Sequence, residues 1–276
     1  MKKILALLLV LVMVLALCAC GEAKTEEPKE EEPAPEEEVV VEETPEEETA
    51  EEPAEETAEE PVEEEPASLS HEEFLAEEDG MQVTVLTYVQ ANESWWDNKI
   101  TLHAQGPDGA YYLYNVECTE EDAAKLVPGT PILVTGDKAT WNGLVEIQDC
   151  TFEFVDAEPW IAEPFDFAAV AAEGKLEEHM NELFTLNEGV IVDKGEGNAF
   201  FFNWDNSGED GNCDLYFDVE VNGETYTFVV RRYLTAPGSE VYEAVKGLQI
   251  GDTVEISGFL YWYEGPQPHI TSIAVK

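Results

Sequence analysis

The chain has 276 residues, with 62 acidic against 13 basic side chains and a formal net charge of -49. A surface this acidic repels phosphate backbones, so composition alone disfavours a nucleic-acid partner. The charge is unevenly spread, and about two hundred residues of mixed composition remain beyond the acidic segment, enough for two small domains.

The N-terminus has the pattern of a secretion signal. Lys2 and Lys3 precede an unbroken apolar run from residue 4 to 19, and the run ends in Leu-Cys-Ala-Cys. This ending resembles the lipobox of bacterial lipoproteins, which implies cleavage before Cys20, lipidation of Cys20, and a signal peptide over residues 1–20. The alternative is an uncleaved membrane anchor. Either way, we expect the remainder outside the cell, anchored to the outer face of the membrane.

Residues 21–67 are predicted to be a disordered tether. From Glu22 to Pro66 the chain is almost entirely Glu, Pro, Ala, Thr and Val, which is too little apolar surface to offset chain entropy. A charged helix would need lysines four residues from the glutamates, and only Lys24 and Lys29 are present.

The rest of the chain alternates short strands with a few helix starts. We expect a first domain over 68–158, a linker over 159–174 and a second domain over 175–276. Helices are predicted to begin at Ser70, Thr119, Lys175 and Ser239, the serines and threonine matching N-cap patterns. Strands are expected near 81–90, 99–105 and 110–117 in the first domain, and near 183–193, 198–204, 213–221 and 225–233 in the second.

An internal repeat follows the strands of each domain. Residues 129–147 read GTPILVTGDKATWNGLVEI, and 251–270 read GDTVEISGFLYWYEGPQPHI. Gly136 corresponds to Gly258 and Trp141 to Trp262. Each copy is an alternating strand interrupted by a glycine, then a turn and a last strand, so the glycine is predicted to bend or bulge the strand.

Three strands, a helix and two strands, with a glycine-bent fourth strand, resemble the five-stranded Greek-key OB barrel. The fold class is therefore expected to be all-β with short helices, in two OB-type barrels behind the tether. The strand at 213–221 is extra to that pattern. A pair of unrelated β-sandwiches is the alternative.

The resemblance implies a ligand face on the second and third strands, flanked by loops. Alternation places Ile100, Leu102 and Ala104 inward and His103 on the outer face. In the second barrel it places Arg231 outward, as an anion contact or an ordinary ion pair.

Aromatic residues gather at the flanking loops and are predicted to stack against a ligand. Trp95 and Trp96 are adjacent, so their side chains point to opposite sides of an extended segment and at least one is expected to be exposed. The remaining candidates are Trp141, Tyr261, Trp262 and Tyr263. Trp141 and Trp262 recur at one repeat position, so packing over a barrel end is an equally open role for them.

The expected function is a non-enzymatic binding module. From residue 71 on there are 39 acidic and 9 basic residues, a net of about -30, which favours an extracellular glycan or protein over nucleic acid. The alternatives are a structural surface protein that associates with calcium, and an OB fold that binds single-stranded nucleic acid through stacking and a basic groove.

No catalytic or metal motif accompanies these features. GxSxG, HExxH and a phosphate-binding glycine loop are missing, the four histidines lie in unrelated contexts, and neither CxxC nor HxxxH spacing occurs. No enzyme activity, cofactor or metal is therefore expected. The loop from Asp205 to Asp214 fails the EF-hand spacing. Cys118 and Cys150 either bridge or remain buried thiols.

Overall fold

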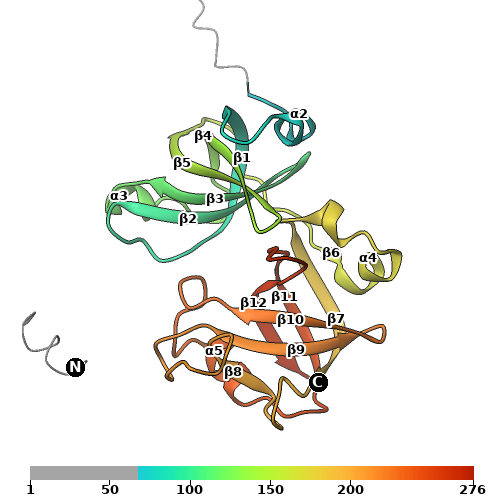
Figure 1. The fold of residues 1–276 in the computed structure, drawn as a ribbon. Helices are drawn as coiled ribbons and strands as arrows, with labels where there is room; N and C mark the ends of the chain where they lie inside the picture. Colours follow the sequence, from blue (N-terminus) through green and yellow to red (C-terminus); the bar gives the residue numbers. More distant parts are fainter. Residues whose placement is uncertain (1–67) are drawn as a thin grey trace, which may run out of the picture. The chain divides into compact units, whose positions relative to one another are not determined.

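The computed structural model describes residues 68–276, all of them within one compact unit. It contains two closed five-stranded β-barrels and a few short helices, which confirms the predicted fold class (Figure 1). The predicted signal, Cys20 and the tether lie outside the described residues. Within these residues, no helix is both long and apolar enough to cross a membrane.

The first barrel has the strand order β1-β2-β3-β5-β4 and closes where β1 pairs with β4. The pairing of β3 with β5 is parallel and the other pairings are antiparallel, which is the order of an OB fold. Its strands are β1 (Gln82–Asn92), β2 (Lys99–Gly106), β3 (Gly109–Glu117), β4 (Pro131–Trp141) and β5 (Leu144–Phe154).

The second barrel repeats this order with β7, β9, β10, β12 and β11, and closes through a β7–β9 pairing. Two short strands, β6 and β8, extend its sheet at the edges. The extra strand is thus β8 rather than the segment at 213–221, which is the barrel's second strand. The bounds are β6 (Phe165–Asp166), β7 (Leu183–Val192), β8 (Phe200–Phe202), β9 (Leu215–Val221), β10 (Glu224–Val230), β11 (Thr253–Phe259) and β12 (His269–Val275).

The helices are short and begin at side-chain caps. Ser70 forms a capping box with Glu73 at the start of α2, and Thr119 and Ser239 accept backbone N–H groups at the starts of α3 and α5. The helix expected at Lys175 is a 3-10 turn, η1. The bounds are α2 (His71–Ala76), α3 (Glu120–Ala123), α4 (Phe167–Glu173), η1 (Leu176–His179) and α5 (Glu240–Lys246).

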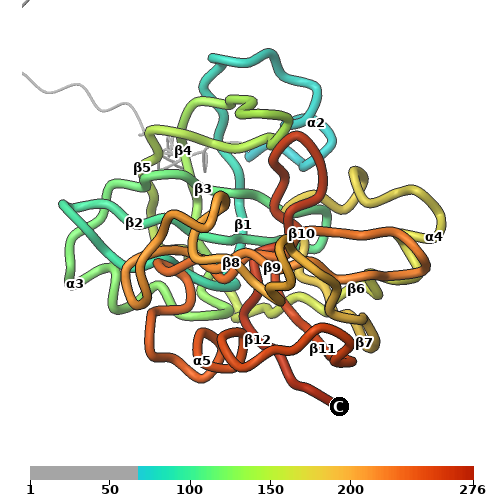
Figure 2. Tube along the Cα trace, turned by 60° about the horizontal axis from the view of Figure 1, so that its bottom comes forward, coloured from blue at the N-terminus to red at the C-terminus, as the bar shows by residue number. Residues whose placement is uncertain are grey.

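The segment expected to be a plain linker contains structure of its own. It holds β6 and the helix α4, whose N-cap is Asp166 and which ends at Gly174 with φ of 71°. Both views place α4 beside β6 and close to β7 (Figures 1 and 2). Phe167 lies at the start of α4 and is fully buried in the core of the second barrel, so this segment packs as part of that domain.

The two repeat glycines bend their strands, as predicted. The β4–β5 register shifts between Thr135 and Asp137, and the β11–β12 register shifts between Ser257 and Gly258. A Cβ on Gly136 would lie 2.7 Å from the Gln148 carbonyl oxygen. A Cβ on Gly258 would lie 2.1 Å from the His269 carbonyl oxygen. Both glycines therefore permit a close backbone approach at a bulge.

Each barrel has its own apolar core, formed by the inward half of its alternating strands. Ile100, Leu102 and Ala104 belong to the first core, as the alternation predicted. The thiols of Cys118, Cys150 and Cys213 are buried and free, so the predicted alternative of buried thiols is the one observed.

Candidate functional site

The outer face of β2 is not open along its length. His103 lies outside the core of the first barrel, as predicted, together with Thr101 and Gln105, yet all three are buried. The second barrel covers this face: the His103 ring stacks on Phe259 with centroids 4.4 Å apart, and the Leu183 N–H donates to Oε1 of Gln105 at 3.0 Å. The expected ligand contact at His103 therefore lies in an interface between the barrels, 1% exposed.

The part of the β2–β3 face that stays open forms a groove with a volume of about 620 Å³. We call it the aromatic groove. It includes the end of the β1–β2 loop, the first residues of β2 and the middle of β3, which is where OB folds bind ligands. Its lining residues are Glu93, Ser94, Trp95, Trp96, Asp97, Lys99, Ile100, Thr101, Tyr114, Asn115, Arg231 and Tyr233.

The two adjacent tryptophans take opposite roles in this groove. Trp95 is half-buried against the first core, and its Nε1–H donates to the Cys118 carbonyl oxygen at 2.8 Å. Trp96 is 79% exposed, which confirms that one indole faces solvent. Trp96 pairs with Lys99 across a tight turn whose central residues, Asp97 and Asn98, both have positive φ. The turn thus holds an exposed indole at the edge of the groove.

Two tyrosines complete the aromatic lining, and neither was among the residues predicted to bind a ligand. Tyr114 and Tyr233 are 41% and 43% exposed. Tyr233 is held by its backbone carbonyl, which accepts the Ser94 N–H at 2.7 Å. The guanidinium groups of Arg231 and Arg232 lie 5.4 and 4.6 Å from the centroid of its ring. The groove therefore offers several exposed rings beside cationic groups.

Arg231 forms ordinary ion pairs, which was one of its two predicted roles. Its Nε contacts Oε1 of Glu93 at 3.3 Å, and its NH1 group contacts Oδ2 of Asp214 at 2.8 Å. Burial raises the pKa of Glu93, and the adjacent guanidinium opposes that rise. Glu93 belongs to the first barrel and Asp214 to the second, so Arg231 links the two.

Lys99 and Arg232 differ from most other cations in the described region because neither forms an ion pair there. Arg232 instead donates hydrogen bonds to Asn212 and to the hydroxyl of Tyr233. In a surface so rich in carboxylates, two cations without ion-pair partners beside one groove are a local exception to the overall charge.

The other predicted aromatics lie at the turns of the two barrels. Trp141 is 57% exposed, whereas Trp262 is half-buried against the core of the second barrel. A Cβ on Gly143 would lie 3.0 Å from the Trp262 indole, so that ring packs on the turn of the first barrel. Tyr261 stacks on His269 at 4.0 Å, and Tyr263 is 45% exposed. None of these residues lines the aromatic groove.

Behind the groove lies a buried group of ionisable side chains. Glu93, His103 and His269 each offer one ligand atom, and these atoms lie within 4.8 Å of one another. Burial lowers the pKa of His103 to about 3 and that of His269 well below its ordinary value, so both rings are neutral. The expectation that the histidines are unrelated is wrong for this pair, because docking of the barrels brings them together.

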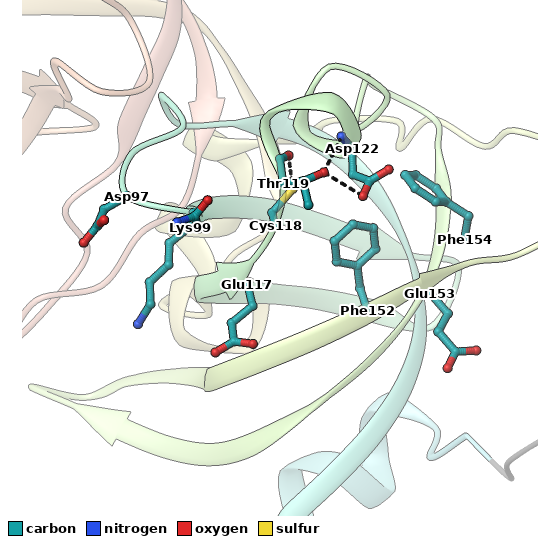
Figure 3. Close-up of a pocket in the computed structure, with 10 residues that line it drawn as sticks. Asp97, Lys99, Glu117, Cys118, Thr119, Asp122, Phe152, Glu153 and Phe154 are labelled. Atoms are coloured by element: carbon teal, nitrogen blue, oxygen red, sulfur yellow. Dashed lines mark hydrogen bonds between the residues drawn. The ribbon is translucent and has the colours of Figure 1, made fainter. Parts of the chain in front are cut away.

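A second depression, also about 620 Å³, shares Asp97 and Lys99 with the aromatic groove (Figure 3). Four carboxylate side chains and one lysine line it, with Phe152 and Phe154. Asp122 accepts a hydrogen bond from the Thr119 hydroxyl there. Burial raises the pKa of the nearby Cys118 thiol to about 11, so it is not a thiolate at neutral pH. This acidic depression shows no reactive group.

The loop from Asp205 to Asp214 is held by bonds of its own. Asp205 accepts the Ser207 N–H, and Asp210 pairs with Lys246 at 2.8 Å. Asp214 accepts hydrogen bonds from the guanidinium of Arg231 and from the Arg232 backbone N–H. Among the described residues, the group at Glu93 is the one in which three potential metal ligands meet, and this loop contributes none of them.

Comparisons with known proteins do not show a family for this chain. No family model matches the chain, and no curated protein matches it. Similar solved structures include a murine DNA-binding protein bound with double-stranded DNA, with 10% identity, a TM-score of 0.34, and 70% of this chain and 94% of that one covered. A HINb domain shows 16% identity and a TM-score of 0.33, with 72% and 100% covered. A Replication Protein A heterotrimer bound to single-stranded DNA shows 10% identity and a TM-score of 0.27, with 72% and 49% covered.

The strand order and closure of both barrels define the chain as a tandem OB-fold protein. The prediction that disfavoured nucleic acid is contradicted by these comparisons, because the similar structures include complexes with double-stranded and single-stranded DNA. The prediction depended on net charge, which averages over the whole chain. Locally, Lys99 and Arg232 form no ion pair within the described region.

Proposed function

We propose that the described region is a non-enzymatic OB-fold module that binds single-stranded nucleic acid in the aromatic groove. The observation that carries the proposal is the open half of the β2–β3 face, where Trp96, Tyr114 and Tyr233 are exposed beside Lys99. Bases stack on such rings whatever their sequence, and cations along the groove contact the phosphates. The second barrel supplies Tyr233 and closes the rest of the face.

The strongly acidic remainder of the surface sets the expected strength of binding. Long-range repulsion slows the approach of a polyanion, so affinity depends on stacking and on a few phosphate contacts. Because Lys99 and Arg232 are the two cations near the groove that form no ion pair within the described region, binding is expected to weaken with salt, but with a shallow slope of about 1–2 in the logarithmic plot. A short strand should therefore bind better than a duplex, whose bases are not available for stacking.

Fluorescence anisotropy of a labelled oligothymidine tests this proposal on the full chain. Trp96→Ala should weaken binding about five- to 150-fold, the equivalent of roughly 1–3 kcal/mol for one stacked base. Trp204→Ala is the matched control, because Trp204 is 69% exposed and does not line the groove. Equal binding by the wild type and Trp96→Ala contradicts the proposal. Binding to a cell-wall glycan fragment, with no response to the oligonucleotide, would also overturn it.

We also propose that this module is displayed as a lipoprotein on the outer face of the cell membrane. The support is the N-terminal sequence alone, with its basic start, apolar run and small residue before Cys20. Metabolic labelling with a fatty acid tests it. Cys20→Ala should abolish the label and release the chain from the membrane. Cys18→Ala should retain both the label and the membrane anchoring. Labelling that persists in Cys20→Ala would refute the assignment.

A further inference from the structure

The buried group behind the groove joins three distant segments of the chain. Glu93 follows β1, His103 lies on β2, and His269 begins β12. Their exposed fractions are 6%, 1% and 4%. We call these three residues the interface cluster. Two of them belong to the first barrel and one to the second, so the cluster exists only when the barrels are docked.

The imidazoles of this cluster lack ordinary partners. Neither ring nitrogen of His103 forms a hydrogen bond within the described region, and Nδ1 of His269 has none either. Buried polar groups almost always have a partner, because an unmatched one costs about 1–3 kcal/mol. Such unpartnered nitrogens next to a buried carboxylate therefore indicate a missing ligand, which would bond one nitrogen of each ring.

Aromatic rings hold the two histidines in place. His103 stacks on Phe259 with an interplanar angle of 14°, and His269 stacks on Tyr261 with an angle of 12°. The His103 and His269 rings are nearly perpendicular, at 82°, with centroids 6.1 Å apart. Stacking fixes the ring planes but leaves the nitrogens free, so these contacts orient potential ligands without using their lone pairs.

We propose that Glu93, His103 and His269 bind a divalent transition-metal ion, with zinc as the best match. Two imidazoles and one carboxylate are donors that zinc accepts, and the site leaves a fourth position open. Tetrahedral zinc with bonds of about 2.0–2.1 Å places its ligand atoms roughly 3.3 Å apart. The three ligand atoms lie within 4.8 Å of one another, so zinc binding requires them to move closer by up to about 1.5 Å.

The local charge accommodates the ion. Arg231 contacts Oε1 of Glu93 at 3.3 Å and is balanced by Asp214 at 2.8 Å, so the pair of carboxylates outnumbers the guanidinium by one. A metal at the cluster would bond across the two barrels and stabilise their docked arrangement. This role is independent of what the aromatic groove binds.

Cobalt(II) substitution in the full chain tests the assignment. After removal of metal with EDTA, titration should give one cobalt ion per chain and the visible absorption of a tetrahedral site, displaced by an equivalent of zinc. Excess calcium and magnesium are included so that exposed carboxylates do not contribute. Elemental analysis of the zinc-loaded chain measures the same stoichiometry without spectroscopy.

Variants locate the ion. His269→Gln should abolish the cobalt spectrum, and Glu93→Gln should weaken zinc at least about tenfold, or about 1.4 kcal/mol. The control is His179→Gln, because His179 pairs with Glu182 at 2.9 Å and lies outside the cluster. If the cluster variants do not fold, the melting temperature of the wild-type chain is the test. Zinc must raise this temperature, and EDTA must reverse the rise. No tetrahedral spectrum in the wild type, or the same spectrum in His269→Gln, overturns the proposal.

Discussion

Replacing Arg231 by methionine tests how the two barrels are joined. The guanidinium bridges Glu93 and Asp214, whose side chains are only 8% and 10% exposed. Removing one partner of a buried pair costs about 3–5 kcal/mol, because the remaining charges lose their compensation. Since Arg231 itself is 32% exposed, water replaces part of the interaction. We therefore expect a loss of about 3 kcal/mol in unfolding free energy.

The assay is chemical unfolding of the full chain in EDTA, with thermal unfolding as a second measure. A loss of about 3 kcal/mol corresponds to a fall of roughly 6–12 °C in the melting temperature of a domain this size. Arg232→Met is the matched control. Because Arg232 forms no ion pair within the described region, this variant should lose little unfolding free energy.

The stability difference between the wild type and Arg231→Met should depend on pH. Burial already raises the pKa of Glu93, and loss of the guanidinium raises it further. The folded variant then takes up a proton more readily than the unfolded chain, so its stability falls as pH rises above the ordinary glutamate value. The gap between wild type and variant should widen from pH 5 to pH 8. A loss below about 1 kcal/mol, or a gap independent of pH, would refute the reasoning.

Three further perturbations address the cluster, the bulge and a helix start. In EDTA, the wild type should lose stability relative to His103→Gln by up to about 1.4 kcal/mol per pH unit as the pH falls from 6.5 toward 3, because the histidine is protonated in the unfolded chain before it is protonated in the folded one. Urea unfolding at several pH values measures this difference. Parallel stability curves for the two proteins would contradict it. Gly258→Ala should destabilise the chain by several kcal/mol, roughly 2–4, since its Cβ would meet the His269 carbonyl oxygen at 2.1 Å. Gly247→Ala should cost much less, because its Cβ would lie 3.3 Å from the nearest atom, the Ala244 carbonyl oxygen. Ser239→Ala should cost about 1 kcal/mol in thermal unfolding by removing the cap of α5, and an unchanged melting temperature would exclude that role.

Much of the fold could be predicted because its determinants are local. The caps at Ser70, Thr119 and Ser239 and the bulges at Gly136 and Gly258 depend on neighbouring residues, and the repeat shows them twice. The helix α4 was missed because its alanines carry no periodic apolar pattern. Strand β8 lies within the strand expected near 198–204, but at the edge of the sheet and not in the barrel. Its three consecutive phenylalanines do not distinguish the two positions.

The site was harder to predict because it depends on how the barrels dock. Alternation correctly placed His103 outside the first core, but no local pattern shows that Phe259 of the other barrel covers it. Tyr233 follows a strand end and carries no motif, so only the tertiary contact with Ser94 reveals that it lines the groove. His103 and His269 become neighbours for the same reason.

Glu93 links the buried cluster to the open groove. It is one of the three potential metal ligands and also lines the groove, where Arg231 contacts its Oε1 and lies over the Tyr233 ring. The net charge of this carboxylate therefore sets how much of the guanidinium's field reaches the exposed rings, since the two charges are only 3.3 Å apart. Neutralising Glu93 leaves the groove more positive without any movement of the backbone. The interior of the docked pair thus controls the electrostatics of the surface on which a polyanion would bind.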